Sequence, residues 1–237
     1  APRNAATNFG SLSTADRQDG TPCRPLCDGG GGRGGRGGMP PDGFGGGRDG
    51  KGWLITCYDI VLDENGFLKS YKTIGENDEA EGTKWYAYVK IHAPSPWYNN
   101  QTYLDTLNPK AVERFVEVTH EKYKEKISDS FGETVPAIFT DEPNANNDSN
   151  MFLPVPEHQG RMAFTWSRFF EETYQATYGE DILDKLPELA WRKKDGSDSL
   201  TKYRFFDFVA EEFSKNFTGQ IGKVVVGQIL QLQLVGG

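Results

Sequence analysis

Apolar and polar residues alternate along residues 52–62, and the alternation resumes along residues 67–74 after a turn sequence at residues 63–66. Alternation with a period of two is typical of a strand with one buried face, and turn residues between two such runs predict a β-hairpin. A third run, residues 84–92, places aromatic and β-branched side chains at alternate positions. We therefore expect three antiparallel strands that form an excursion beside the main fold.

Helical spacing replaces this alternation after residue 107. Asn108 followed by Pro109 predicts the N-cap and the first residue of a helix. The side chains expected to face inward then recur at helical spacing, at Val112, Phe115, Val116, Thr119 and Tyr123. A loop that contains Gly132 separates this helix from the next apolar run.

Two more helices and a strand are predicted in the last third of the chain. The first helix covers residues 162–178 and is closed by Gly179. The second covers residues 203–221, and its apolar face consists of Phe206, Val209, Phe213 and Phe217. Residues 224–235 alternate like a strand.

An apolar run at residues 135–140 ends in two adjacent carboxylates and a proline. The run predicts a short strand buried on both faces, and Pro143 provides no ladder donor, so the strand is expected to stop at Glu142. In (β/α) barrels the chemistry lies where strands end, which makes Glu142 and its neighbour Asp141 candidate catalytic residues. A solvated turn after a strand would carry the same tripeptide, and this alternative stays open.

Four short segments occur in an informative order. They are Leu107-Asn108-Pro109, residues 119–123, residues 139–143 and Tyr178-Gly179. Together, over residues 54–221, they resemble bacterial and fungal glycoside hydrolases of the α-L-rhamnosidase type. The resemblance implies hydrolysis of O-glycosyl bonds and assigns Glu142 as an active-site glutamate, with Asp141 beside it.

The same resemblance implies an α/β fold, a partial (β/α) TIM-type barrel with an antiparallel β excursion. A full barrel takes about 250 residues, and this chain shows only two or three βα units, so we expect a truncated barrel. In the resembled group a second glutamate comes from a later strand, beyond the end of this sequence. The chain alone is therefore expected to hydrolyse aryl rhamnosides poorly or not at all.

A second stretch has the composition of a sugar-binding surface. It combines flat aromatic rings with amide donors and acceptors, in the residues Trp97, Tyr98, Asn99, Asn100 and Gln101. Such groups suit the apolar face and the hydroxyl rim of a sugar, while an aromatic plug over the end of a barrel is an equally good interpretation. Trp85 and Tyr88 lie within the alternation of a strand and are expected to be packing residues.

Glycoside hydrolysis requires two carboxyl groups, so Glu142 needs a second carboxylate as its partner. Asp141, Asp105 and Asp59 are the possible partners within the chain. Asp105 is also a candidate sugar ligand, although a carboxylate that stabilises the turn before Asn108 accounts for it better. A non-catalytic carbohydrate-binding module that retained part of a barrel is the alternative to an enzyme.

Composition limits the remaining functions. The 237 residues carry a net charge of −8, which argues against a nucleic-acid partner, and no apolar run reaches the length of a membrane span. His92, His120 and His158 are too scattered for a metal triad, and neither metal nor cofactor is expected. Residues 1–50 are expected to be irregular because residues 29–50 are dominated by glycine, which leaves residues 51–237 as the glycosidase-like domain.

Overall fold

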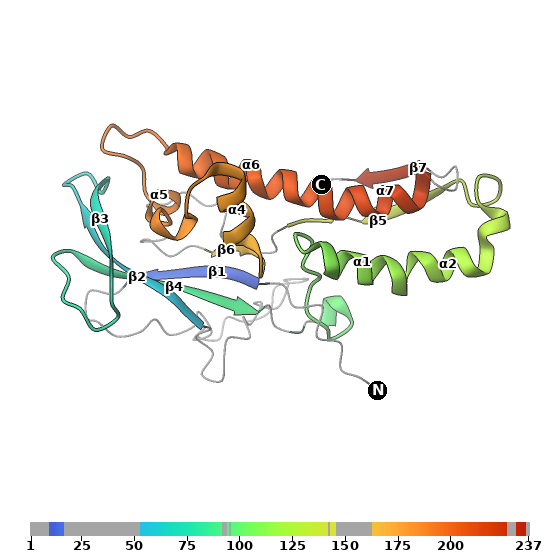
Figure 1. The fold of residues 1–237 in the computed structure, drawn as a ribbon, viewed down its shortest axis with the longest axis horizontal. Helices are drawn as coiled ribbons and strands as arrows, with labels where there is room; N and C mark the ends of the chain where they lie inside the picture. Colours follow the sequence, from blue (N-terminus) through green and yellow to red (C-terminus); the bar gives the residue numbers. More distant parts are fainter. Residues whose placement is uncertain are drawn as a thin grey trace, which may run out of the picture. The chain divides into compact units, whose positions relative to one another are not determined.

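A computed structural model describes residues 10–16, 53–91, 94, 96–141, 143–145, 163–226 and 231–235 (Figure 1). The chain divides into two compact units. The sheet unit consists of Asn8–Tyr103 and Asp148–Phe205, and the helix–strand unit consists of Leu104–Asn147 and Phe206–Gly237 together with Ala1–Thr7. No helix among the described residues is long and apolar enough to cross a membrane.

The sheet unit contains an antiparallel sheet with the strand order β3-β2-β4-β1-β6. The strands are β1 (Gly10–Asp16), β2 (Trp53–Leu62), β3 (Leu68–Ile74), β4 (Thr83–Ile91) and β6 (Ala163–Trp166). The hairpin of β2 and β3 and its neighbour β4 confirm the three antiparallel strands predicted from the alternation. Gly66 closes the hairpin with a φ of 79°, a conformation that glycine adopts at low cost.

Two strands of this sheet were not predicted. β1 pairs with both β4 and β6 and lies within the first 50 residues, where no regular element was expected. The glycine-rich residues 29–50 lie outside the described part of the chain. Residues 163–166 were predicted to begin a helix, but they form β6, because a short apolar run fits a buried strand as well as a helix and pairing with β1 decides between them.

Helices of the sheet unit follow β6. They are α4 (Phe170–Tyr178), the 3-10 turn η4 (Ile182–Asp184), α5 (Pro187–Ala190) and the first residues of α6 (Leu200–Phe213). Gly179 ends α4 with a φ of 70°, which confirms the predicted helix stop. The last turn of α4 is thus closed by a left-handed glycine, the usual C-terminal cap.

Aromatic side chains form the core of this unit. Trp85 is fully buried between Tyr58 and Trp191, with ring centroids 5.7 Å and 5.0 Å away. Phe170 stacks on Trp166 at 4.4 Å, and its ring lies 5.2 Å from that of Phe205. Tyr88 is buried as well, so the prediction that Trp85 and Tyr88 are packing residues is confirmed.

The helix–strand unit consists of helices that precede parallel strands. Its elements are α1 (Pro109–Val118), α2 (His120–Ile127), the 3-10 turn η2 (Ser128–Ser130), β5 (Ala137–Asp141), the rest of α6, the π-helical turn η5 (Ser214–Thr218), α7 (Gly219–Val226) and β7 (Gln231–Val235). β5 and β7 pair in parallel. Val112, Val116, Phe217 and Ile221 form the core of the unit.

Asn108 caps α1 as predicted, since its side chain accepts hydrogen bonds from the backbone N–H groups of Lys110 and Ala111, and Pro109 is the first helical residue. The inward face predicted to extend to Tyr123 ends earlier, because the helix breaks at Thr119 and Tyr123 is 66% exposed. The break changes the direction in which the later side chains point.

Two strand predictions need correction in this unit. β5 is not buried on both faces, since Phe139 is 59% exposed, and β7 is its one strand partner among the described residues. Residues 224–226 continue α7 rather than begin a strand, so β7 starts only at Gln231. A parallel strand pair with preceding helices is what repeated βα units produce, while the barrel itself stays a prediction.

Candidate functional site

The candidate catalytic pair lies at the carboxyl end of β5. Asp141 is the last residue of the strand and is exposed. Its register partner is Val235, the last residue of β7, so both strands end at the same edge. Glu142 lies outside the described residues, directly between Asp141 and Pro143. Asp141 is the last described residue of β5, so the predicted stop at Glu142 stays a prediction.

A buried polar turn precedes α1. Asp105 and Thr106 are each only 1% exposed. A carboxylate oxygen of Asp105 accepts a hydrogen bond from the backbone N–H of Leu107 at 3.2 Å, and its backbone oxygen accepts one from Asn108, also at 3.2 Å. Asp105 thus has the turn-stabilising contacts that the structural interpretation of this residue requires.

Thr106 connects this turn to the segment after β5. Its hydroxyl group donates a hydrogen bond to the backbone oxygen of Asn144 at 3.1 Å. Asn144 follows Glu142 by two residues, and Pro143 and Asn144 are both partly buried. The structure therefore brings the turn of Asp105 and Thr106 next to the segment that carries the candidate acid.

Asn216 holds the other side of the same turn. It is 4% exposed, and its side-chain amide donates to the backbone oxygen of Leu107 and to a carboxylate oxygen of Glu212, both at 2.8 Å. In addition, the side-chain amide of Gln220 donates to the backbone oxygen of Pro109 at 2.9 Å. Helical periodicity did not single out Asn216. The signal that could have found this residue is an amide next to Phe217 on an apolar helix face.

The aromatic and amide stretch belongs to the sheet unit. The 3-10 turn η1 (Pro96–Tyr98) leads into Asn99 and Asn100, which have φ values of 55° and 56°. Left-handed backbone is unusual for residues other than glycine, and asparagine tolerates it better than most. Gln101 donates its backbone N–H to the oxygen of Tyr98, and the Tyr98 and Tyr103 rings are 5.0 Å apart.

The amides of this stretch are open to solvent. Asn99, Asn100 and Gln101 are all exposed, while Tyr98 is partly buried. The side chain of Trp97 lies outside the described part of the structure. Asp141 and Asp105 thus belong to one unit, and the candidate sugar-contacting residues belong to the other.

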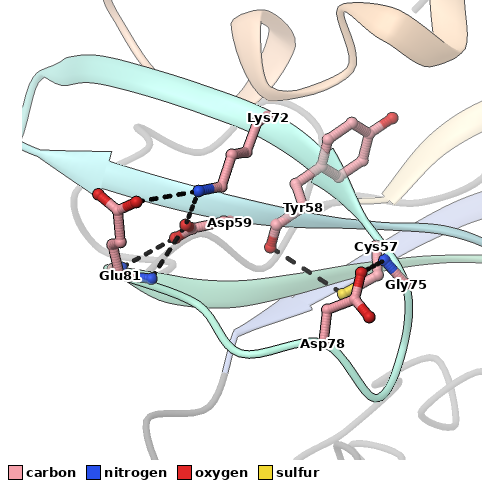
Figure 2. A network of polar contacts seen from close by, with 8 residues as sticks. Cys57, Tyr58, Asp59, Lys72, Gly75, Asp78 and Glu81 are labelled. Atoms are coloured by element: carbon pink, nitrogen blue, oxygen red, sulfur yellow. Dashed lines mark hydrogen bonds and ion pairs between the residues drawn. The ribbon is translucent and has the colours of Figure 1, made fainter.

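Asp59 lies in the middle of β2, within a network of polar contacts (Figure 2). It is 2% exposed, and its carboxylate accepts the backbone N–H groups of Glu81 at 3.0 Å and Gly82 at 2.8 Å. Lys72 lies 3.5 Å from the same carboxylate and 3.0 Å from that of Glu81. The Asp59 carboxylate therefore stabilises the connection between β3 and β4 through these backbone hydrogen bonds.

The pKa of Asp59 reflects these contacts. Burial alone would raise it, but the hydrogen bonds from Glu81 and Gly82, together with Lys72, stabilise the anion and hold the pKa below its ordinary value. A general acid at neutral pH needs a raised pKa instead. Asp59 has the properties of a structural anion rather than those of a partner for Glu142.

The other candidate groups have structural surroundings. The imidazole of His120 lies 2.9 Å from the hydroxyl of Thr119 and packs edge-on against Phe115, and burial lowers its pKa. Cys57 is buried and forms no disulfide, and burial raises its pKa to about 11. Among the residues that the structure describes, no cluster of His, Cys, Asp and Glu could hold a metal ion. His92 and His158 lie outside that part.

Comparison with known proteins gives one distant likeness. No family model matches the chain, and no curated protein matches it. The structure is distantly similar to that of a rhamnosidase from Novosphingobium sp. PP1Y, with a TM-score of 0.42 and 17% identity. The match covers 72% of this chain and 15% of the rhamnosidase, so the chain spans a small part of that protein. At these values the likeness assigns no function.

Proposed function

We propose that this chain carries part of a glycoside hydrolase active site of the α-L-rhamnosidase type, with Glu142 as general acid or general base. The observation that carries the proposal is the position of Asp141, followed in sequence by Glu142, at the carboxyl end of β5, a strand with a parallel partner. In barrel enzymes the carboxylates that carry the chemistry lie at the carboxyl ends of parallel strands, which supports the proposal. A partial (β/α) barrel around this strand is part of the same proposal.

Glu142 would act on the oxygen atoms around the scissile bond. As a general acid it would donate its proton to the leaving oxygen, and as a general base it would take a proton from the attacking water. Asp141 is exposed at the strand end, so it is available as the neighbouring carboxylate.

The substrate in this proposal is a neutral sugar. The exposed amide groups of Asn99, Asn100 and Gln101 would form hydrogen bonds with sugar hydroxyls, and the rings of Trp97 and Tyr98 would supply apolar surface. Asp105 is less suited to contact sugar, since it is buried and holds its own turn. A sugar without charge is also compatible with the net charge of −8.

The test is the replacement Glu142→Gln in the full-length protein, assayed with aryl glycosides that include α-L-rhamnosides. Gln keeps the shape and hydrogen-bonding capacity of the side chain but cannot exchange a proton, so kcat should fall by about 10²–10⁴-fold. Glu133→Gln is the matched control, because Glu133 is an exposed glutamate in the loop before β5. The control should leave kcat unchanged.

Leaving groups of different acidity separate the two roles of Glu142. A dinitrophenyl leaving group departs without protonation, so a general-acid role predicts that Glu142→Gln retains turnover on that substrate and loses it on a less activated one. Equal turnover in both variants on every substrate would refute the catalytic assignment. Sugar binding without any turnover would favour the non-catalytic carbohydrate-binding module instead.

A further inference from the structure

The segment after β5 is held from one side by a buried polar turn. Asp105, Thr106 and Leu107 are all buried, and burial of polar groups is costly unless they are hydrogen-bonded. The turn meets this condition on both sides, since Thr106 donates to the backbone oxygen of Asn144 and Asn216 donates to that of Leu107. Through these two hydrogen bonds the turn links the helical segment that contains Asn216 to the segment after β5.

The helical side of this connection is unusual. Asn216 lies in the π-helical turn Ser214–Thr218, between α6 and α7. Such turns are rare within α-helices and occur frequently at functional sites. Asn216 is also fixed within its own helix by the carboxylate of Glu212, which accepts the second amide hydrogen bond at 2.8 Å.

We propose that Thr106 and Asn216 are positioning residues for the carboxylate pair at the end of β5. Asn216 fixes the backbone of Leu107, and Thr106 then fixes Asn144, two residues beyond Glu142. On the other side of Glu142, Asp141 is fixed by the pairing of β5 with β7. The described residues on either side of Glu142, Asp141 and Asn144, are thus held by hydrogen bonds, and this inference rests on the proposed function of Glu142.

The precision of this anchoring matters for acid–base catalysis. A misplacement of about 1 Å at a reacting group costs about 100-fold in rate. Loss of the Thr106 hydroxyl would remove one restraint on Asn144 without removing any group that touches substrate. The expected effect is therefore on kcat, with little change in KM.

The experiment compares Thr106→Val, Thr106→Ser and a matched control. Valine keeps the shape of threonine but has no hydroxyl group, while serine keeps the hydroxyl. Thr119→Val is the control, because the Thr119 hydroxyl also donates to a backbone oxygen, that of Phe115, in the same unit but within its own helical segment. Each variant is made in the full-length protein and is measured by amide hydrogen exchange and by kcat and KM on aryl glycosides, at equal folded fractions.

Thr106→Val should raise hydrogen exchange in a peptide covering residues 140–145 by about five- to tenfold, as expected for the loss of one hydrogen bond. Its kcat should fall by about 10- to 100-fold with KM changed less than about twofold, and Thr106→Ser should restore both readouts. Asn216→Leu keeps a similar side-chain volume and should also raise hydrogen exchange in the peptide covering residues 140–145.

The possible failures can be told apart. If Glu142→Gln lowers kcat but Thr106→Val behaves like Thr119→Val, the positioning role is refuted and the proposed function stands. If exchange rises in residues 140–145 while kcat does not fall, Thr106 is a structural residue and the role is likewise refuted. If Glu142→Gln has no effect on turnover, the proposed function fails and the positioning role fails with it.

Discussion

Replacing Asp59 with asparagine should destabilise the sheet unit without involving the candidate catalytic pair. Asn has nearly the same shape as Asp, but it has one oxygen acceptor and no charge. Asp59 accepts two backbone N–H groups, from Glu81 and Gly82, while it is almost fully buried (Figure 2). In the variant, one of these N–H groups must face the new NH₂ group.

The expected loss in the free energy of unfolding is about 2–4 kcal/mol. A buried donor left without its acceptor costs about 1–3 kcal/mol, and the remaining bond loses the extra strength of a charged acceptor. Lys72 contributes little to this sum, because its side chain is more than half exposed and lies 3.5 Å from the carboxylate. The loss therefore comes from the two backbone contacts.

Tryptophan fluorescence during urea unfolding measures this loss directly. All five tryptophans, Trp53, Trp85, Trp97, Trp166 and Trp191, belong to the sheet unit, so the signal reports on that unit alone. Asp78→Asn is the matched control, since the exposed Asp78 carboxylate accepts one backbone N–H, from Gly75 at 2.8 Å. The control should lose less than about 1 kcal/mol.

The pH dependence has a defined sign. Because the pKa of Asp59 is lower in the folded chain than its ordinary value, its contribution is complete above that ordinary value and is lost as the pH falls through the folded pKa. The difference in the free energy of unfolding between the unmodified chain and Asp59→Asn should thus stay constant from pH 7 to about pH 5 and shrink below about pH 4. Equal losses in Asp59→Asn and Asp78→Asn at pH 7 would refute the reasoning.

Two further substitutions test local packing and capping. Gly82→Ala should cost about 3 kcal/mol or more, because an added Cβ would lie 2.0 Å from the backbone oxygen of Ile60. Urea unfolding should show a smaller loss for Gly75→Ala, because the atoms nearest to its Cβ belong to the movable Asp78 carboxylate. Asn108→Ala should cost about 1 kcal/mol by removing the α1 cap, and Asn108→Asp should restore it. Circular dichroism at 222 nm measures this loss, and equal stability of the Ala and Asp variants would contradict the capping role.

Features that are determined by neighbouring residues could be predicted from the sequence. The cap at Asn108, the turn at Gly66 and the stop at Gly179 each depend on the chemistry of a few adjacent residues, and all three are present in the structure. The strand that ends in Asp141 was predicted for the same reason, because its apolar run is bounded by a proline. Local rules therefore located the candidate site along the chain.

Features that depend on distant pairing were not predictable. Residues 163–166 form a strand because β1, about 150 positions earlier, supplies a partner, and no local signal records that partner. Likewise, the exposure of Phe139 depends on how many strands flank β5, which its own apolar sequence does not specify. In both cases tertiary context decided between conformations that the local sequence allowed equally.

The surroundings of the candidate acid combine both kinds of information. Asp141 was found locally, but the contacts that fix its neighbours join Thr106 to Asn144 and Leu107 to Asn216, across 38 and 109 positions of the chain. A helix of regular period accounts for Phe213 and Phe217 without giving Asn216 a role. The π-helical turn becomes intelligible only when Asn216 is seen to reach the turn before α1, because the hydrogen bonds made there offset the cost of an irregular helix. Residues that position a catalytic group are thus least visible in the sequence when their partners are backbone atoms, since backbone atoms occur at every position.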